Sequence, residues 1–225
     1  MKLQEICLDL PYVNVKKLPL GVDTINDYKI NWKSKRRQFS LETRCMCSML
    51  ERIMERKTNN LFWKIIIGCV EKDELFESKI KINDGICYVM VPILYDEFIS
   101  CGDYVKKKLA IAFIENGLLE ISKQIEFDYS YLNNAIEYIK ENKYINEWEW
   151  KKITRKGEEV SIWIFHDVKE VKIYANIVKG GIENKVLLYK CLPDEWVYSR
   201  KLGKLYWADD DTAVLENSEE KIKLT

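Results

Sequence analysis

Residues 160–181, VSIWIFHDVKEVKIYANIVKGG, decide how the second half of this 225-residue chain folds. Apolar residues recur at every second position around 162–164 and again over 171–177. A period of two places alternate side chains on opposite faces of a strand, so one face can be buried. Residues 166–167 and 180–181 supply turn signals after each run. The stretch therefore predicts two neighbouring antiparallel strands.

The same period extends over the whole carboxy-terminal third of the chain. It begins with Trp148 and Trp150 and has a turn signal at Gly157. Four later segments continue the pattern, at residues 186–192, 195–200, 203–208 and 212–216. Short strands joined by tight turns are typical of an antiparallel meander. We expect such a sheet from residue 146 onward.

The amino-terminal and middle parts of the sequence predict a different mixture of elements. Residues 61–70 and 85–94 are runs rich in β-branched side chains, which predict two central strands. The first forty residues favour short strand pieces around turns. A helical stripe of apolar residues favours a helix from about residue 43 to Met54, with Ser40 as its expected cap. A strand over residues 39–47, whose side chains alternate as well, is the alternative.

Two further amphipathic helices are predicted between residues 103 and 143. Asp103 and Asp128 precede their apolar stripes and are expected to cap them. On the first of these helices, Lys106 and Lys107 are expected to face water.

The order of these elements predicts an α+β fold. It has a mixed amino-terminal part with central strands, a two-helix middle and a carboxy-terminal antiparallel sheet. We expect a single domain over residues 1–225, which can be subdivided into a mixed part at 1–145 and an antiparallel sheet at 146–225.

Composition narrows the function classes. Thirty-six basic residues balance thirty-six acidic residues, so no overall field attracts nucleic acid or an anionic membrane. The longest uncharged run, 86–95, is shorter than the about 20 apolar residues that a membrane helix needs. Glu5 stands where a signal peptide would begin its apolar region. We expect a cytoplasmic protein with no membrane partner, and its richness in lysine, isoleucine and asparagine is typical of bacterial coding.

The seven cysteines predict buried thiols in a reducing compartment. Their number is odd, and most have apolar neighbours. Cys45 and Cys47 are one residue apart, but structural zinc sites use two close pairs of ligands, and the chain has no second pair. We expect one of these two side chains in the core and the other at the surface. No metal and no cofactor is expected.

Catalytic groups are sparse, so the sequence leaves enzymatic activity uncertain and favours a non-catalytic protein. His166 is the one histidine and falls in an expected turn. Asp96, Glu97 and Glu126 are the other groups that acid–base chemistry could use. Phosphate-binding and hydrolase motifs are absent from the sequence. A carboxylate-based, hydrolase-like enzyme is kept as an alternative.

A basic cluster supports a second alternative, nucleic-acid binding. It consists of Lys33, Lys35, Arg36 and Arg37, and the aromatic residues beside it could stack on bases. The competing interpretation is a solvated strand end or turn, because the chain has no net positive charge.

The last third combines aromatic and acidic residues in a way that favours a protein interface. Aromatic side chains anchor interfaces, and an acidic rim speeds the encounter with a basic partner. The candidate partner-binding residues are Trp148, Trp150, Trp163, Tyr206, Trp207, Asp209, Asp210 and Asp211. The main hypothesis is a cytoplasmic bacterial protein that binds another protein, in the manner of an immunity protein or antitoxin that neutralises a basic toxin.

Overall fold

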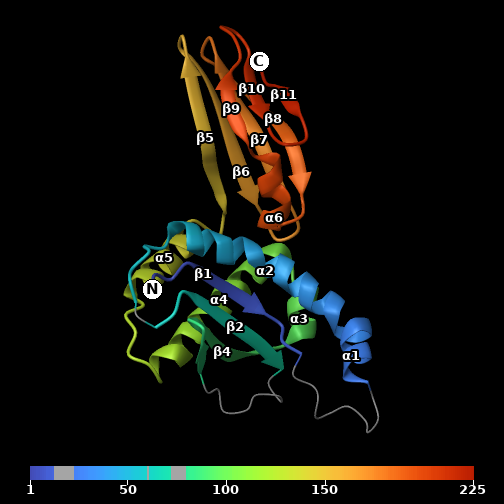
Figure 1. The fold of residues 1–225 in the computed structure, drawn as a ribbon, viewed down its shortest axis with the longest axis vertical. Helices are drawn as coiled ribbons and strands as arrows, with labels where there is room; N and C mark the ends of the chain where they lie inside the picture. Colours follow the sequence, from blue (N-terminus) through green and yellow to red (C-terminus); the bar gives the residue numbers. More distant parts are fainter. Residues whose placement is uncertain (13–22, 60, 72–79) are drawn as a thin grey trace. The chain divides into compact units, whose positions relative to one another are not determined.

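The computed structural model describes residues 1–12, 23–59, 61–71 and 80–225. The chain divides into two compact units, Met1–Ile145 and Asn146–Thr225, and each has its own sheets (Figure 1). Helices and strands are present in similar amounts, with a mixed sheet first and an antiparallel sheet last, which confirms the α+β class.

The first unit is built on a mixed sheet of four strands in the order β1-β2-β4-β3. Three of them run parallel, namely β1 (Glu5–Asp9), β2 (Lys64–Glu71) and β4 (Ile86–Ile93), and β3 (Lys81–Asn83) pairs antiparallel to β4. The two β-branched runs of the sequence thus form the central strands β2 and β4, as predicted.

One face of this sheet is covered by helices. Along β4, Cys87, Val89 and Val91 are buried, whereas Tyr88 and Met90 on the opposite face are about two-fifths exposed. Helix α2 packs against β1, α4 packs against β2 and β4, and the two helices contact each other. From residue 33 on, the helices of this unit are α2 (Lys33–Ile53), α3 (Tyr95–Ser100), α4 (Asp103–Ser122) and α5 (Ser130–Glu141).

The helical region begins earlier than the sequence pattern indicated. Helix α1 (Thr24–Asp27) and a π-helical turn (Tyr28–Trp32, η2) lead directly into α2, so the prediction of strand pieces over residues 24–40 was wrong. Asp23 starts this region, because its carboxylate accepts the N–H groups of Ile25 and Asn26. Ser40 lies inside α2 and does not cap it.

The other two predicted caps behave differently. Asp103 is the first residue of α4, after the N-cap position at Gly102, and no side-chain bond caps that helix. The carboxylate of Asp128 accepts the backbone N–H of Ser130 at 3.0 Å, at the start of α5. This bond satisfies one of the orphan donors of the helix terminus.

A buried ion pair joins α2 to α4. Lys106 Nζ lies 2.7 Å from Glu42 Oε2, and the two side chains are 4% and 9% exposed. Gln38 donates to the other oxygen of Glu42 at 2.9 Å, and the ring of Phe98 lies 5.5 Å from the ammonium. The expectation that Lys106 and Lys107 face water was wrong, because the surface of α4 that carries them is buried.

Removal of Lys106 is expected to destabilise the first unit strongly. Lys106→Ala leaves the Glu42 carboxylate buried without its cation, which costs about 3–5 kcal/mol. Lys123→Ala, at the C-cap of the same helix, is the matched control, because Lys123 pairs with Glu120 at an exposed site worth at most about 1 kcal/mol. Urea unfolding followed by circular dichroism measures both free energies, and equal losses would contradict a special role for the buried pair.

Close packing of α4 on β2 requires Gly117. A Cβ added at this position would lie 2.7 Å from Cδ1 and 2.8 Å from Cγ1 of Ile67, which is fully buried on β2. Glycine is unfavourable inside a helix, so here the close approach outweighs helix propensity.

Gly117→Ala is expected to lower stability in spite of its better helix propensity. Overpacking costs about 1–3 kcal/mol, and the double variant Gly117→Ala with Ile67→Val should recover part of that loss because it makes room for the new methyl group. Thermal unfolding of the two variants beside the native chain measures the effect. A Gly117→Ala protein that is more stable than the native chain would contradict this account of the packing.

The second unit pairs a four-stranded meander with a small three-stranded sheet. The meander has the order β5-β6-β7-β8 and is antiparallel throughout, as predicted. Its strands are β5 (Glu147–Arg155), β6 (Glu158–His166), β7 (Val171–Lys179) and β8 (Ile182–Cys191). The small sheet has the order β11-β10-β9 and consists of β9 (Lys204–Trp207), β10 (Ala213–Glu216) and β11 (Lys221–Lys223).

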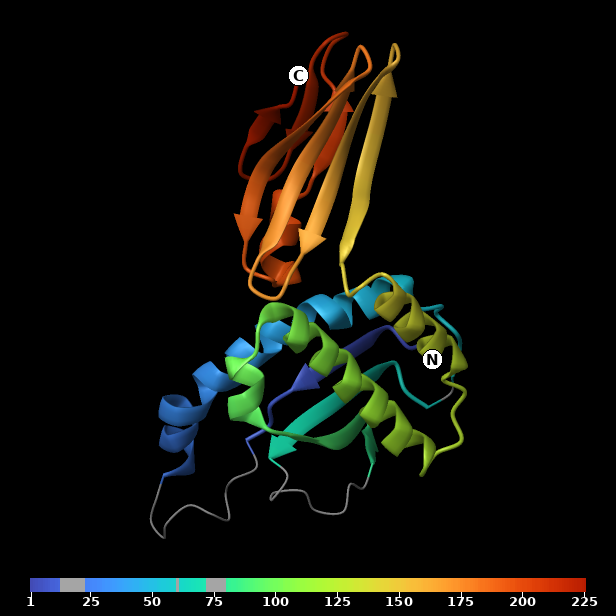
Figure 2. The ribbon, with the colours of Figure 1, turned by 180° about the vertical axis from the view of Figure 1, so that it is seen from behind.

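The core of this unit lies between its two sheets. Figure 2 shows the meander in front of the small sheet. Ile162, Ile164, Ile173 and Ala175 from the meander are fully or almost fully buried together with Leu215 from β10. The segment between the sheets is helical, with α6 (Glu195–Tyr198) followed by a 3₁₀ turn (Ser199–Lys201, η4).

The predicted strand at 195–200 was therefore wrong. Asp194 accepts the N–H of Trp196 at 2.9 Å and caps α6, and the local alternation of apolar residues cannot compete with this cap.

Candidate interaction surface

The aromatic residues of the proposed interface separate into an inner and an outer group. The inner group packs against the core of the second unit and contributes to its burial; it consists of Trp148, Trp150 and Trp207. Trp148 and Trp150 share a face, as the sequence indicates, and a register shift of β5 against β6 lies between Glu149 and Lys151.

Trp163 and Tyr206 face away from the core. Trp163 lies between the buried residues Ile162 and Ile164 on β6 and donates its indole N–H to Ser161 Oγ at 3.0 Å. Tyr206 donates to the carboxylate of Glu216 at 2.7 Å, and this bond raises the pKa of the phenol. Only Trp163 belongs to the outer face of the meander.

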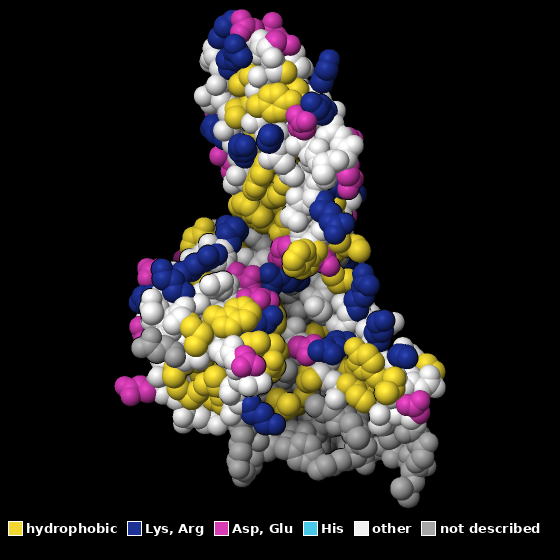
Figure 3. Space-filling view, in the orientation of Figure 1, with side chains coloured by type: hydrophobic (Ala, Val, Ile, Leu, Met, Phe, Trp, Pro, Cys, Tyr) yellow, Lys and Arg dark blue, Asp and Glu magenta, His cyan; other side chains and the backbone are white. Residues whose placement is uncertain are grey.

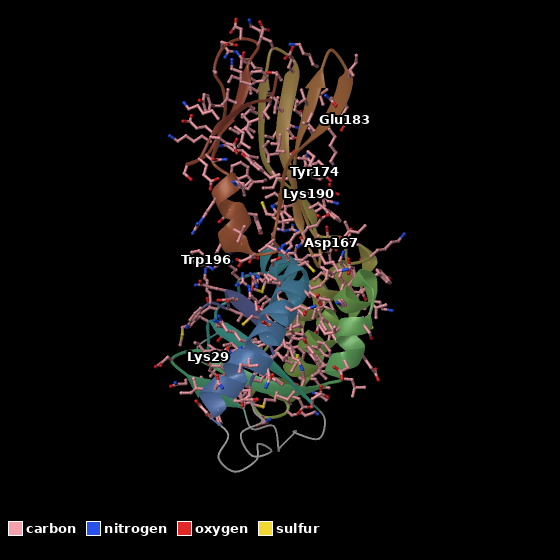
Figure 4. The ribbon with its side chains drawn as sticks, turned by 90° about the vertical axis from the view of Figure 1, so that its right-hand side faces the viewer. Lys29, Asp167, Tyr174, Glu183, Lys190 and Trp196 are labelled. Atoms are coloured by element: carbon pink, nitrogen blue, oxygen red, sulfur yellow. The ribbon has the colours of Figure 1, made fainter. Side chains whose placement is uncertain are left out.

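That outer face carries a row of large side chains that crosses all four strands. Directly paired residues of antiparallel strands lie on the same face, and the pairing aligns Glu149, Trp163, Tyr174 and Leu187. Phe165 lies two residues after Trp163 and therefore on the same face of β6. We call Trp163, Phe165, Tyr174 and Leu187 the aromatic face; Tyr174 is labelled in Figure 4.

The aromatic face is unusual for the solvent side of an antiparallel sheet. Such faces normally carry polar residues, but Trp163, Phe165 and Tyr174 are only partly buried here, and Leu187 is 44% exposed. The sequence pattern pointed to Trp163 alone among these four residues, and Phe165, Tyr174 and Leu187 were missed. Tyr174 could have been predicted, because it occupies an outward position of β7 and pairs with Trp163 once the two strands are aligned.

Charges around the aromatic face neutralise one another. Lys185 Nζ lies 4.6 Å from the ring centre of Tyr174 and 3.1 Å from the carboxylate of Glu147. Lys152 pairs with Glu159 at 2.6 Å across β5 and β6. Cations that are already paired give little attraction to phosphate, whereas aromatic surface with a polar rim fits a protein interface.

The acidic turn at Asp209–Asp211 is largely engaged within its own unit. One oxygen of Asp209 accepts the N–H groups of Asp211 and Thr212, at 2.9 and 2.7 Å. Asp210 pairs with Arg155 and Lys156 of the β5–β6 hairpin. The turn therefore holds the two sheets together. Among the described contacts, the carboxylate of Asp211 has neither backbone donors like those of Asp209 nor an ion pair like that of Asp210.

Another exposed aromatic side chain lies in α6. Trp196 is 81% exposed, and its side chain is labelled in Figure 4. The sequence analysis did not select it, because no pattern around residue 196 distinguishes a surface tryptophan from a core one.

The basic cluster lies at the start of α2, not on a strand end or turn. Arg36 binds both carboxylate oxygens of Asp9, at 2.7 and 2.8 Å, and Lys35 Nζ lies 5.6 Å from the ring centre of Tyr95. Lys33, Lys35 and Arg37 are exposed. On the face shown in Figure 3, basic and acidic side chains are interspersed.

The aromatic residues beside this cluster are not presented for stacking. Phe39 is fully buried, and Trp32 is partly buried and donates its indole N–H to the carbonyl of Leu10 at 3.0 Å. The cluster thus supplies three exposed cations, and neither Trp32 nor Phe39 offers an open face for base stacking.

The groups considered for catalysis do not come from one unit. His166 is the last residue of β6, fully buried, with its ring 5.6 Å from that of Tyr198, so it does not lie in a turn. Asp96, Glu97 and Glu126 are exposed residues of the first unit. The first two share the opening turn of α3, and Glu126 follows α4.

All seven cysteines are free thiols, and Cys45, Cys47, Cys69 and Cys87 are buried. Burial raises the pKa of Cys7 and of Cys87 to about 11, and raises the pKa of Cys69 well above its usual value. Cys47 is buried too, so the expectation of a surface thiol beside Cys45 was wrong. Within the described ranges, no group of three or more histidine, cysteine, aspartate or glutamate side chains could hold a metal ion.

Two cavities of the first unit adjoin Tyr131. One, of about 340 Å³, is lined in part by Lys57, Asn59 and Asp128, and the other, of about 270 Å³, by Ile53 and neighbouring side chains of α5. The Tyr131 hydroxyl and Asn59 Nδ2 have no hydrogen-bond partner among the described residues, but both atoms are shut off from solvent. A ligand in either cavity would reach these donors only after a rearrangement.

Comparisons with protein-family models, with curated proteins and with solved structures found no match. Among the described helices, none is long and apolar enough to cross a membrane. The assignment of the interaction surface is therefore based on the geometry of this chain alone.

The hydrogen bonds of Asp209 predict a pH-dependent contribution to stability. These bonds lower the pKa of Asp209, so the contribution is complete above the unfolded-state value of about 3.9 and is lost as the pH falls through the folded-state value. Asp209→Asn should unfold at a lower temperature than the native chain near pH 7, and the difference should shrink below about pH 4. Asp209→Asn keeps an oxygen that can accept these N–H groups but removes the charge that strengthens the bonds. Asp211→Asn is the control, because it makes the same charge change at a carboxylate that accepts neither bond. Equal behaviour of the two variants would contradict the assignment.

Proposed function

We propose that this chain is a non-catalytic protein-binding protein that acts in the bacterial cytoplasm, of the immunity or antitoxin type that occupies a partner toxin. The observation that carries the proposal is the aromatic face, where Trp163 and Tyr174 lie side by side on the outer surface of the meander. Tryptophan and tyrosine dominate the binding energy of protein interfaces because they bury large areas at small cost in side-chain entropy.

The surroundings of the aromatic face favour a protein partner over a nucleic acid. Lys185 lies over Tyr174 and near Glu147, and Lys152 pairs with Glu159, so the cations next to the rings are already compensated. Nucleic-acid affinity depends on uncompensated lysine and arginine. The partner is expected to cover the rings with apolar side chains.

The acidic turn has a secondary part in this proposal. Asp210 is neutralised by Arg155 and Lys156, which leaves Asp209 and Asp211 as the charges that would steer a basic toxin. Charges at the rim of an interface change the association rate and its salt dependence more than the affinity.

Alanine variants of the aromatic face are expected to lose the partner. The 225-residue chain, tagged at one end, is incubated with extract of its native cell, and proteins retained at one-to-one stoichiometry are quantified by mass spectrometry. Trp163→Ala and Tyr174→Ala should each weaken retention of one such protein by about tenfold or more, as hot-spot truncations do. Unchanged melting temperatures would show that both variants stay folded.

Trp196→Ala is the matched control, because it removes an exposed tryptophan of the same unit outside the aromatic face. Loss of the partner in Trp196→Ala but not in Trp163→Ala would overturn the assigned surface. The retained protein, expressed alone, should slow cell growth, and co-expression of the native chain but not of Trp163→Ala should restore it. A retained protein without toxicity would overturn the toxin part of the proposal.

A further inference from the structure

Strand β8 forms a long open edge of the second unit. It spans ten residues, Ile182–Cys191, and stands last in the order β5-β6-β7-β8, so among the described strands it pairs with β7 alone. All six residues from Ile182 to Leu187 are exposed. Edge strands present unpaired backbone N–H and C=O groups, which makes them templates for another strand.

The turn before β8 determines which backbone groups point outward. Gly180 and Gly181 both have positive φ and form a two-residue turn that joins Lys179 to Ile182. In such a hairpin the pair next to the turn is hydrogen-bonded, and hydrogen-bonded pairs then alternate with non-bonded pairs. The backbone N–H and C=O groups of Ile182 therefore point toward β7.

The alternation leaves the backbone groups of Glu183, Lys185 and Leu187 directed away from β7. Their partners on β7, among them Val178 and Tyr174, are the non-bonded positions of the ladder. The regular register ends after Leu187, where the pairing shifts between Ile173 and Tyr174. The open edge therefore offers three N–H and three C=O groups in alternation.

Other edges of the structure are protected in ways that β8 is not. On the edge strand β1, Ile6 donates its backbone N–H to the carboxylate of Glu51 at 3.0 Å. The edge strand β5 packs beside β9, and Arg155 of β5 donates to the backbone carbonyl of Asp209 at 3.1 Å. Strands β3 and β11 have only three residues each.

Natural edges are also blocked by proline or by charged side chains, but β8 contains no proline. The ammonium of Lys185 lies over Tyr174 and close to Glu147, which places it across the sheet face. Glu183, labelled in Figure 4, is the remaining charge among the three outward positions.

We propose that β8 accepts an extended segment of the partner protein as a fifth strand, hydrogen-bonded to Glu183, Lys185 and Leu187. Donors and acceptors that repeat about every 6.8 Å along an edge match the backbone of another extended polypeptide. The outer side chains of the added strand would continue the row of Trp163, Tyr174 and Leu187, so an apolar residue is expected beside Leu187. This inference rests on the proposed function, since it gives the mode by which the partner binds.

A proline at an outward position tests the edge without breaking the native ladder. Lys185→Pro removes an N–H that has no partner on β7, and its ring would collide with an incoming strand. Lys185→Ala is the matched control, because it removes the side chain and keeps the backbone donor. If Lys185→Pro does not fold by circular dichroism, Glu183→Pro with Glu183→Ala replaces the pair.

The probe is a phage-displayed library of linear 12-residue peptides selected on the native chain. Selected peptides should bind Lys185→Pro about tenfold or more weakly than Lys185→Ala, which lacks the same side chain, and they should slow amide hydrogen exchange of the native chain at residues 183, 185 and 187. Failure to select any peptide, or equal binding to Lys185→Pro, would overturn the added strand.

The cellular partner separates this inference from the proposed function. A partner that is lost by Trp163→Ala but bound fully by Lys185→Pro would overturn strand addition and leave the protein-binding function standing. Edge-binding peptides in the absence of any stoichiometric cellular partner would support the edge and overturn the proposed function.

Discussion

Side chains of β6 and β7 alternate between two environments, and this constraint governs the whole second unit. Every second residue, from Val160 to Ile164 and from Val171 to Ile177, enters a core that the small sheet covers from the other side. The intervening residues must then lie outside. Trp163 and Tyr174 are consequently neighbours at the surface, because neither can enter the core unless every other side chain of its strand also changes face.

A different constraint governs the first unit, where two helices share one face of a mixed sheet. The contact between α2 and α4 encloses Lys106 and Glu42, and Gln38 satisfies the second oxygen of the carboxylate. A buried pair of this kind is weak evidence for net stability, but its geometry is demanding. Its physical effect here is to restrict how α4 can lie on α2.

The sequence allowed the strands to be predicted where the pattern is local. The runs around Ile65 and Val89 and the alternation around Ile173 each depend on neighbouring residues, and short turns such as Gly180–Gly181 fix the pairing. The burial of Lys106 was not predictable, because its partner Glu42 is 64 residues away. Likewise, alternation indicates that Trp148 and Trp150 share a face, but only the small sheet decides which face is covered.

The meander also has a consequence for biosynthesis. Its four strands join sequence neighbours through turns at Gly157, at 167–170 and at Gly180–Gly181, so loop-closure entropy is small and pairing is fast. Translation completes β8 before the residues that form β9 and β10. During synthesis, the apolar face of the meander therefore stays exposed to solvent until about residue 216 has left the ribosomal exit tunnel. A chaperone can bind this face between the synthesis of β8 and that of β10.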